Sequence, residues 1–468
     1  MCSIEHTMAE PSAGVPQGLA VALVSLGCPK NLVDSENMTA WIQEAGWTMV
    51  SDPALAHVII VNTCGFIESA VREGIDTILA MADYKQSGRC DFLIVAGCLS
   101  QRYYRDFAES LPEVDAILGT GSYYSVRDAI EQLYHQESEG EGPLIFRSID
   151  PDDRLRHLRT HHPVSTGAYA YLKVAEGCDN RCAYCAIPAL RGSLTSRPLE
   201  ELIAEAEHLV KQGATEIILV GQDTTSYGTD LYGVRQLPEL MRQICRIQGV
   251  EQVRFLYGYA DGMTDELLTV MAEEPKIIPY IDLPIQHASD RILERMNRSD
   301  REEDLRNTFA RIRRYLPDVV LRTTVMVGFP GETEADFATL CQFVKDIRFN
   351  HLGCFIFSPE RGTPAYQMSD TIPAPIAEER YDVIMSIQKE ITAAYHQKLI
   401  GETRSFVVEG VSDDGIFYVG RIPEQAPEVD SITYVVSELV LTKGKRYPIQ
   451  IVEAEEYELT GVCSEFTE

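Results

Sequence analysis

The chain has 468 residues, of which 45% are hydrophobic and 24% charged, as expected for a soluble globular protein with roughly two to four domains. Its formal net charge of −30 disfavours non-specific binding to a phosphate backbone and favours a basic partner, or simply solubility. The sequence contains no run of about 18 apolar residues, and residues 1–16 have no apolar stretch, so we expect neither a membrane span nor a signal peptide. We expect residues 1–16 to be a disordered leader.

Residues 19–146 are expected to form a first domain around a parallel sheet. Helix-like stretches at 34–45 and 68–81 separate apolar runs, and this alternation is typical of a parallel sheet with helices on its faces. The predicted strands are residues 21–26, 58–62, 92–96 and 116–118. The acidic segment 136–143 suits a domain boundary, and residues 150–163 are expected to be a linker.

Residues 166–399 are expected to form a second domain of six β/α units, which predicts a partial (β/α)6 barrel. The stretch Leu199–Lys211 has apolar residues on one helical face, and Pro198 suits its first turn. The predicted strands are residues 169–175, 216–220, 253–257, 280–283, 321–327 and 352–357. Barrels of this kind place their sites at the C-terminal ends of the strands.

Residues 401–466 are expected to form a third, small β-barrel. Short β-rich runs alternate there with turn residues such as Ser412 to Gly415. The predicted strands are residues 403–409, 415–420, 431–436 and 446–454. The predicted fold class is therefore α/β: a parallel α/β domain, a partial barrel and a C-terminal β-barrel.

Three of the 12 cysteines are packed together after a predicted strand. Cys178, Cys182 and Cys185 have Cys-x3-Cys-x2-Cys spacing, which in a chain without an export signal indicates metal binding in a reducing cytoplasm. Three thiolates can hold three irons of a 4Fe–4S cube and leave the fourth iron open for a ligand. The alternative is a zinc site completed by a distant His or Cys. The spacing favours a radical S-adenosylmethionine (SAM) cluster.

A second set of cysteines is scattered along the first domain. Cys28, Cys64 and Cys98 each come just past a predicted strand, and the carboxyl ends of parallel strands lie at one edge of a sheet. The three thiols are therefore expected to converge on a second cluster with an open iron. Neighbouring glycines would let the backbone approach it. The alternative is three ordinary buried thiols, which is also our interpretation of the remaining cysteines.

Two clusters suggest a division of labour. The cluster of the second domain would reduce bound SAM and generate a 5′-deoxyadenosyl radical that abstracts hydrogen from an unactivated carbon. The protein would exclude water and position the target. The cluster of the first domain would supply sulfur to the carbon radical.

Six sequence motifs, three of which contain these cysteines, are similar to those of a known family. They are Ser-Leu-Gly-Cys-Pro-Lys-Asn at 25–31 with Asp-Ser-Glu at 34–36, Val-Asn-Thr-Cys-Gly-Phe-Ile at 61–67, the three-cysteine run at 177–188 with Arg-Gly at 191–192, Asp-Leu-Pro-Ile-Gln-His at 282–287, Val-Gly-Phe-Pro-Gly-Glu-Thr at 327–333 and Ser-Pro-Glu-Arg-Gly-Thr-Pro at 358–364. With them the chain resembles the methylthiotransferases of the radical SAM class, over nearly its whole length. It is most similar to the branch that modifies ribosomal protein S12.

The resemblance implies an N-terminal cluster domain, a radical SAM barrel and a TRAM β-barrel. It implies two 4Fe–4S clusters, ligated by Cys28, Cys64 and Cys98 and by Cys178, Cys182 and Cys185. It implies conversion of a β-carbon C–H of an aspartate in ribosomal protein S12 to C–S–CH3, with one SAM as methyl donor and another as radical source. An electron donor such as a flavodoxin or ferredoxin and a cytoplasmic location follow from the same resemblance.

The alternative is the branch that methylthiolates an adenosine of tRNA. Members of that branch usually have Gly-Cys-Gln-Met-Asn at the first cysteine, and Ala or Ser after the second. This chain has Pro29-Lys30-Asn31 and Gly65 instead, which resemble the ribosomal-protein branch. One departure is Ala260, where that branch is expected to have Pro; it lies in a strand-end loop and does not affect the cysteines.

Other candidate residues rest on position alone. Tyr184, between two of the cysteines, could contact the adenine of SAM, although ordinary loop packing explains it equally well. Gln222, Val327 and Gly328 end predicted strands and could contact SAM, although turn formation also explains the glycine. We interpret His287 as a hydrogen-bonded structural histidine.

The charge of the third domain bears on the partner. Residues 401–468 contain 14 acidic and 5 basic residues, a formal net charge of −9. A domain that binds RNA is expected to have a basic face, so no specific nucleic acid is predicted as a partner. Ribosomal proteins of the S12 kind are strongly basic, and we expect the acidic barrel to dock one. The alternative is that these residues only solvate the barrel.

Overall fold

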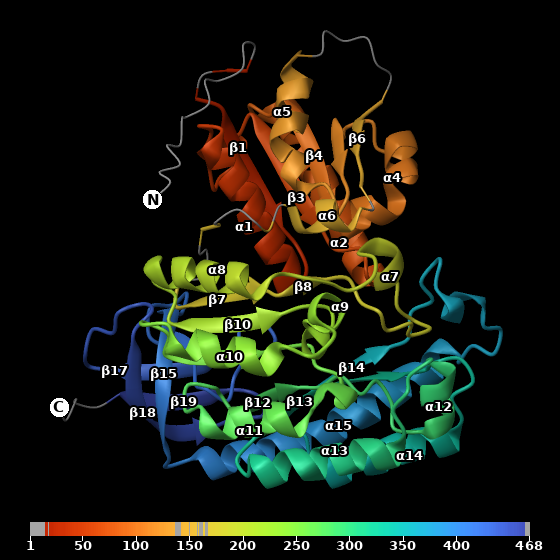
Figure 1. Ribbon diagram of the computed structural model, residues 1–468, viewed down its shortest axis with the longest axis vertical. Coiled ribbons are helices and arrows are strands. Elements are labelled where there is room, and N and C mark those ends of the chain that lie inside the picture. The colour runs from red at the N-terminus through yellow and green to blue at the C-terminus, as the bar shows by residue number, and fades with distance from the viewer. Residues whose placement is uncertain are drawn as a thin grey trace.

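The computed structural model describes residues 15–463, apart from residues 17, 136–141, 149, 157, 159–161 and 164–166. Residues 1–14 of the expected leader, and most of the boundary expected at 136–143, lie outside the described residues. Val15, at the end of that leader, is buried against the core of the first sheet. Figure 1 shows an N-terminal α/β part above a half-barrel, with a small closed barrel beside it.

The N-terminal part is a six-stranded parallel sheet with the order β2-β1-β3-β4-β5-β6. Its strands are β1 (Ala20–Ser25), β2 (Thr48–Met49), β3 (Val58–Thr63), β4 (Phe92–Gly97), β5 (Ala116–Leu118) and β6 (Leu144–Phe146). Both faces are covered, as the unbroken apolar runs of a parallel sheet require. Ile60 of β3 packs on one face with Ile42 and Ile130, and Ile59 on the other with Ile78 and Phe107. The predicted parallel sheet is confirmed, with two more short strands.

The helices of this part are α1 (Pro29–Glu44), α2 (Glu68–Ala82), α3 (Tyr84–Ser87), α4 (Cys98–Ser110), α5 (Val126–His135) and α6 (Pro151–Arg156). Helix α1 begins five residues before the predicted helix, because Pro29 occupies its first turn directly after Cys28. The expected linker at 150–163 is packed in its described residues. It contains α6, and Arg154, Leu158 and His162 are buried.

The central part is a half-barrel of six parallel strands in two sheets, with the orders β11-β10-β7 and β12-β13-β14. The strands are β7 (Tyr169–Lys173), β10 (Glu216–Val220), β11 (Gln252–Phe255), β12 (Tyr280–Asp282), β13 (Val320–Val327) and β14 (His351–Ile356). A parallel bridge between Val253 and Ile277 joins the two sheets. The predicted partial (β/α)6 barrel is confirmed.

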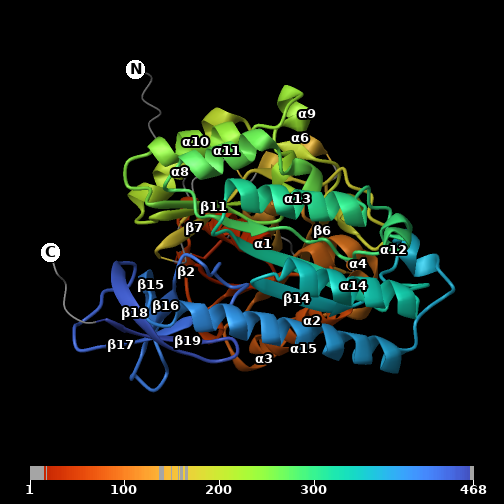
Figure 2. The same ribbon diagram turned by 90° about the horizontal axis from the view of Figure 1, so that it is seen from below.

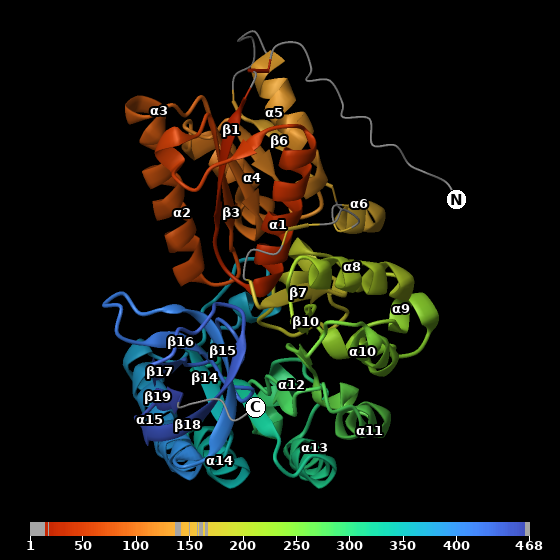
Figure 3. The same cartoon turned by 90° about the vertical axis from the view of Figure 1, so that its left-hand side faces the viewer.

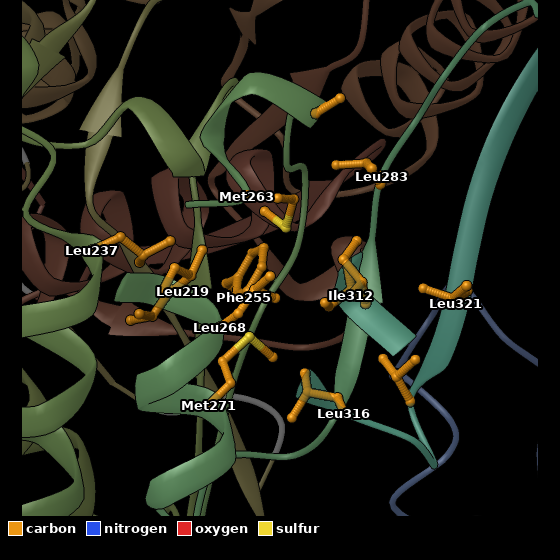
Figure 4. Packing of buried hydrophobic residues seen from close by; sticks show 14 of the residues in the cluster. Leu219, Leu237, Phe255, Met263, Leu268, Met271, Leu283, Ile312, Leu316 and Leu321 are labelled. Atoms are coloured by element: carbon orange, nitrogen blue, oxygen red, sulfur yellow. The ribbon is translucent and has the colours of Figure 1, made fainter. Parts of the chain in front are cut away.

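Helices cover the outside of the half-barrel, where a large apolar core forms. They are α8 (Leu199–Lys211), α10 (Leu237–Arg246), α11 (Asp265–Glu273), α12 (Asp290–Arg295), α13 (Glu302–Tyr315), α14 (Glu334–Ile347) and α15 (Ala374–Leu399). Two short helices lie in loops: α7 (Ile187–Leu190), whose Leu190 packs with Cys98 of the N-terminal part, and α9 (Thr229–Tyr232). In Figure 4, Leu219 and Phe255 from the strands lie against Leu268 and Met271 of α11. A short hairpin, β8 (Ala175–Glu176) with β9 (Thr195–Ser196), extends the first strand of the half-barrel.

The C-terminal part is a closed barrel with the order β15-β16-β17-β19-β18. Its strands are β15 (Thr403–Val411), β16 (Tyr418–Arg421), β17 (Thr433–Ser437), β18 (Arg446–Ala454) and β19 (Leu459–Cys463). The predicted small β-barrel is confirmed, and β19 is a strand that the sequence pattern did not predict. Figure 2 shows α15 leading the chain to this barrel.

The interior of the half-barrel is filled partly by its neighbours. Tyr171 and Tyr280 point into a buried cluster that also contains Val33 of α1 and Ala426 from the closed barrel. Figure 3 shows the lower end of α1 above β7 and beside the closed barrel. The closed barrel contacts the start of the half-barrel strands, as in the hydrogen bond from Tyr280 to Asp430 (2.6 Å). No described helix is long and apolar enough to cross a membrane.

Candidate functional site

The three scattered cysteines meet where three adjacent strands of the N-terminal sheet end. Cys28 precedes α1 after β1, Cys64 follows β3, and Cys98 begins α4 directly after β4. Strands β1, β3 and β4 are neighbours in parallel register, so their ends lie side by side. Burial, followed by the nearby Cys98 and Cys28 thiols, raises the pKa of Cys64 to about 12. The predicted convergence of the three cysteines is therefore observed.

Two glycines bring these strand ends together. Gly27 has a φ of +95°, and a Cβ on it would lie 2.8 Å from the Cβ of Cys64. Gly97 has a φ of +104°, and a Cβ there would collide with the carbonyl oxygen of Thr63. We expected the glycines to make room for a cluster. Their nearer role is to let the cysteine-bearing backbones approach one another.

Asparagines in the motifs fix the same loops. Asn31 donates hydrogen bonds to the carbonyl oxygens of Leu26 (3.1 Å) and Thr63 (3.0 Å). Asn62 donates to the carbonyl oxygen of Asn31 (2.9 Å) and to Ser35 Oγ (2.9 Å). Both side chains are buried, so these bonds hold the first two cysteine loops in one arrangement.

The second set of cysteines lies on one loop at the carboxyl end of the half-barrel's first strand. Cys178 follows β8, and its backbone N–H donates to the carbonyl oxygen of Gly192 (3.1 Å). Each of the three sulfurs has a hydrogen-bond partner: Asn180 Nδ2 donates to Cys178 Sγ (3.4 Å), and the Ile187 N–H donates to Cys185 Sγ (3.4 Å). The Tyr259 hydroxyl lies 3.5 Å from Cys182 Sγ.

The chemistry of both donor sets fits an iron–sulfur cluster. Each set has three free thiols close together, of which Cys98 in the first set and Cys178 and Cys182 in the second are buried. N–H donors are directed at Cys98, Cys178 and Cys185. Hydrogen bonds of this type are characteristic of cluster cysteines. Within the described part of the chain, no group of three His, Cys, Asp or Glu side chains is arranged to hold a single metal ion. An iron–sulfur cluster does not require three ligands on one metal ion, because each thiolate binds a separate iron.

A buried network of charges connects the two sets. Lys173 donates to Asp34 of α1 (2.6 Å) and to Glu176 (2.5 Å). Arg191 pairs with the same two carboxylates and reaches Cys98. All four charged side chains are at most 2% exposed. The N-terminal part and the half-barrel are therefore held together by charges that cannot separate without being left buried and unpaired.

A cavity of about 1010 Å³ opens beside the cysteines, between α2 and β14. Its lining includes Phe66, Tyr184, Gln286, Met326 and Phe357. Phe66 is two residues from Cys64, and Tyr184 lies between Cys182 and Cys185, so one loop from each cysteine set contributes to the cavity wall. Its size and mixed apolar and polar walls are those of a small-molecule site.

One of the four predicted SAM contacts lines this cavity, and a second lies at the end of β10. Tyr184 lines the cavity and accepts a hydrogen bond from Arg298 (3.4 Å). Gln222 donates to Glu176 (2.6 Å), and its buried Oε1 has no partner among the described residues. A buried acceptor without a donor suits a polar ligand group at that point.

The other two predicted contacts have different roles. The Val327 side chain belongs to the apolar core. Gly328 has a φ of +72°, donates its N–H to Glu332 (2.5 Å), and would bring a Cβ to 2.7 Å from that of Ala377. A SAM contact at these positions stays a prediction and would have to use backbone atoms. His287 is buried and bonds to Glu332 and the Ser289 N–H, as expected for a structural histidine.

Sequence reasoning gave no role to several residues that line the site. Lys30 lies 3.1 Å above the ring of Tyr257, whose φ is +64°, and Arg298 lies over the ring of Tyr259. Burial raises the pKa of Cys28, but Lys30 and Arg191 outweigh it and hold the pKa below its ordinary value. The only feature of the sequence that could have predicted such a role is a position next to a cysteine motif. Tyr257 and Tyr259 lie far from these motifs in the sequence.

Three family models match the chain. The radical SAM superfamily matches residues 172–344, the family described as Uncharacterized protein family UPF0004 matches residues 20–119, and the TRAM domain matches residues 400–463. Among solved structures, the chain is similar to the radical SAM methyltransferase TsrM from Kitasatospora setae, which has cobalamin and a [4Fe-4S] cluster bound. The two structures superpose with a TM-score of 0.54 over 75% of this chain and 74% of that chain. At 13% identity this similarity shows the fold alone.

Full-length relatives are much closer in sequence. The chain is 45% identical to ribosomal protein uS12 methylthiotransferase RimO of Acetivibrio thermocellus, over 94% of this chain and 97% of that protein. It is 44% identical to the protein of the same name from Geobacter sulfurreducens, over 94% and 98% of the two chains.

Proposed function

This chain belongs to the family of ribosomal protein uS12 methylthiotransferases, RimO, and from this premise we propose that its six clustered cysteines hold two iron–sulfur clusters. The protein is a radical SAM methylthiotransferase that modifies ribosomal protein S12 and uses SAM and a 4Fe–4S cluster. We assign that cluster to Cys178, Cys182 and Cys185, and a second 4Fe–4S cluster to Cys28, Cys64 and Cys98. The domains are taken as residues 19–146, 166–399 and 401–466.

One observation supports this assignment: both cysteine sets lie at the carboxyl ends of parallel strands, and a loop residue near each set, Phe66 or Tyr184, lines the same cavity. When bound, the cluster of the half-barrel supplies the electron that cleaves SAM, and the cluster of the N-terminal domain supplies sulfur. The chain's own groups position the reactants. The free Oε1 of Gln222 can accept a hydrogen bond from SAM, and the Tyr184 ring offers an apolar wall to its adenine.

The finer substrate assignment is the β-carbon of one aspartate in ribosomal protein S12. The cavity is accessible from outside past α2, where three acidic side chains, Glu68, Glu73 and Asp76, and one basic side chain, Arg72, are exposed. Acidic groups at the entrance favour a basic protein over a phosphate backbone. We further assign a flavodoxin or ferredoxin as electron donor, since SAM cleavage consumes one electron at a time. The cytoplasm, where ribosomal proteins are made, is the proposed location.

Product analysis tests this function. The protein, reconstituted with iron and sulfide without oxygen, is incubated with SAM, a reductant, and either ribosomal protein S12 or tRNA. Mass spectrometry should find a methylthio group on one aspartate of the ribosomal protein and none on the RNA. Methylthiolated adenosine as the main product would contradict the substrate assignment, and an iron content of roughly four per chain would contradict the two clusters.

A further inference from the structure

Arg191 has an unusual set of partners for a residue outside the cysteine sets. It follows α7 of the half-barrel, is 2% exposed, and extends its guanidinium into the N-terminal domain. There its Nε donates to Cys98 Sγ (3.3 Å). Its Nη1 donates to Glu176 (2.9 Å), and its Nη2 donates to Asn31 Oδ1 (2.7 Å). Both Nη atoms also lie 3.1 Å from Asp34 Oδ2.

The same residue is attached to the other cysteine set through the backbone. Gly192, the next residue, accepts the hydrogen bond from the Cys178 N–H (3.1 Å). The carbonyl oxygen of Leu190, the preceding residue, accepts from Thr120 of the N-terminal domain (2.7 Å). A shift of this loop would therefore move a partner of Cys178 and a partner of Cys98 together.

The geometry requires a guanidinium. A planar fork of donors can reach a thiol, an amide oxygen and two carboxylates at once, whereas an ammonium offers one compact point of charge. The carboxylates of Asp34 and Glu176 hold the fork in place and leave Nε directed at the sulfur. A cationic N–H donor at a cluster sulfur favours the reduced, more negative state of the cluster, because hydrogen bonds to the sulfurs set the potential.

We propose that Arg191 is a positioning residue of the second cluster, which holds Cys98 in place and raises the reduction potential of the iron–sulfur group that this thiolate binds. The proposal rests on the two-cluster assignment above. It gives a residue of the radical SAM domain direct influence on the sulfur-supplying site of the other domain. A purely structural arginine would stabilise the domain interface without changing the potential.

The test uses full-length protein in which Cys178, Cys182 and Cys185 are replaced by Ala, so that only the second cluster is loaded. Its midpoint potential is measured by redox titration followed by electron paramagnetic resonance, before and after Arg191→Gln. The variant should titrate at a lower potential, because a cation and an N–H···S bond are lost. Arg191→Lys should fall between the two, since it keeps the charge without the fork.

Arg197→Lys is the matched control. Arg197 is also a buried arginine of the half-barrel, paired with Glu205 (2.5 Å), but it bonds to no cysteine. The Arg197→Lys variant should leave the midpoint potential of the second cluster unchanged. If Arg191→Gln does not fold, as judged by circular dichroism, Arg191→Lys alone decides.

Two failures can be told apart. An unchanged potential in a folded, loaded Arg191 variant overturns the role of this residue and leaves the clusters untouched. A parent protein that binds no iron overturns the assignment of Cys28, Cys64 and Cys98 itself.

Discussion

The two cysteine sets are built by different means. Cys178, Cys182 and Cys185 lie within eight consecutive residues of one loop, so a local sequence pattern brings them together. Cys28, Cys64 and Cys98 come from three loops and meet only because β1, β3 and β4 are neighbours in a parallel sheet. The first set depends on one loop, whereas the second depends on the whole N-terminal sheet.

This difference has a chemical counterpart. The loop set lies where the half-barrel can present SAM, and the dispersed set lies across the domain interface, with Arg191 and Lys173 between them. Neither set alone suffices for the proposed reaction. The predictions that follow separate the two sets, from the largest expected effect to the smallest.

The largest effect is expected from Cys182→Ala. Loss of one thiolate from a three-thiolate site removes the iron cluster that reduces SAM. Both 5′-deoxyadenosine and the methylthio product should fall to background, as measured by liquid chromatography of the reaction. Cys341→Ala is the control, because this thiol lies in α14, away from both sets, and should leave both products near wild-type levels. Robust deoxyadenosine from Cys182→Ala would exclude this cysteine as a ligand.

Replacing Cys28, Cys64 and Cys98 together by Ala should separate the two half-reactions. One cluster remains, so some reductive cleavage of SAM should persist while the methylthio product disappears. Iron analysis should find about four irons per chain instead of about eight. Product at the wild-type rate would show that sulfur does not come from this set.

Gly97→Ala should damage only the dispersed set. An alanine there must adopt a φ of +104° and collide with the Thr63 carbonyl, at a cost of about 3 kcal/mol or more. About half of the iron should be lost, with SAM cleavage retained. Gly46→Ala has a similar φ of +80° but open space around it, so it should cost only about 1 kcal/mol and lose no iron. Equal iron loss in both variants would mean that the collision is not the cause.

The interface between the two sets is expected to depend on pH through His162. Burial alone would lower its pKa, but hydrogen bonds to Glu205 of α8 and Glu36 of α1 raise it from 6.5 to about 9. The stabilisation is therefore complete below pH 6.5 and is lost as the pH rises through about 9, with a size of at most about 3 kcal/mol. The melting temperatures of wild type and His162→Gln should differ at pH 6 and converge near pH 9.5. A difference that does not change with pH would exclude a charged histidine.

The smallest effect concerns docking of the basic substrate. Glu453, Glu455 and Glu458 are exposed on the β18–β19 hairpin of the closed barrel. Their replacement by Lys should weaken binding to ribosomal protein S12 several-fold at low salt, and the difference should shrink as salt rises. Replacement of Glu273, Glu303 and Asp304 by Lys, on the outer helices α11 and α13, is the control, because it changes the net charge by the same amount. Affinity that does not change with salt, or is tighter for tRNA, would contradict docking by charge.

The sequence predicted the fold well where local patterns carry it. Unbroken apolar runs predicted most strands of the three parallel sheets, and turn residues predicted the closed barrel. The sequence pattern predicted the structure less well in segments whose conformation depends on contacts between domains. Residues 150–163 looked like a linker, yet Arg154 and His162 are buried because distant segments supply their partners.

The candidate site divides in the same way. The loop cysteines follow from spacing, and the dispersed cysteines follow from spacing together with sheet topology. The roles of Lys30, Tyr259 and Arg191 depend on how two domains meet, and no local pattern encodes that. The core packing of Val327 was missed for a related reason, since the residue that ends a strand can face either the site or the core.

The loop of the closed barrel that contains Ala426 limits how this protein could be taken apart or recombined. Ala426 packs in the buried cluster inside the half-barrel. On the same loop, the Pro427 carbonyl oxygen accepts a hydrogen bond from Tyr171, and the Asp430 carboxylate accepts one from Tyr280. A chain truncated at Gly401 would admit water to the interior of the half-barrel. Loss of SAM cleavage after truncation would therefore result from hydration of this interior and would not show that a docking surface was lost. A TRAM domain grafted from another enzyme would need a loop of the same shape. The two barrels are therefore expected to be inherited as a matched pair.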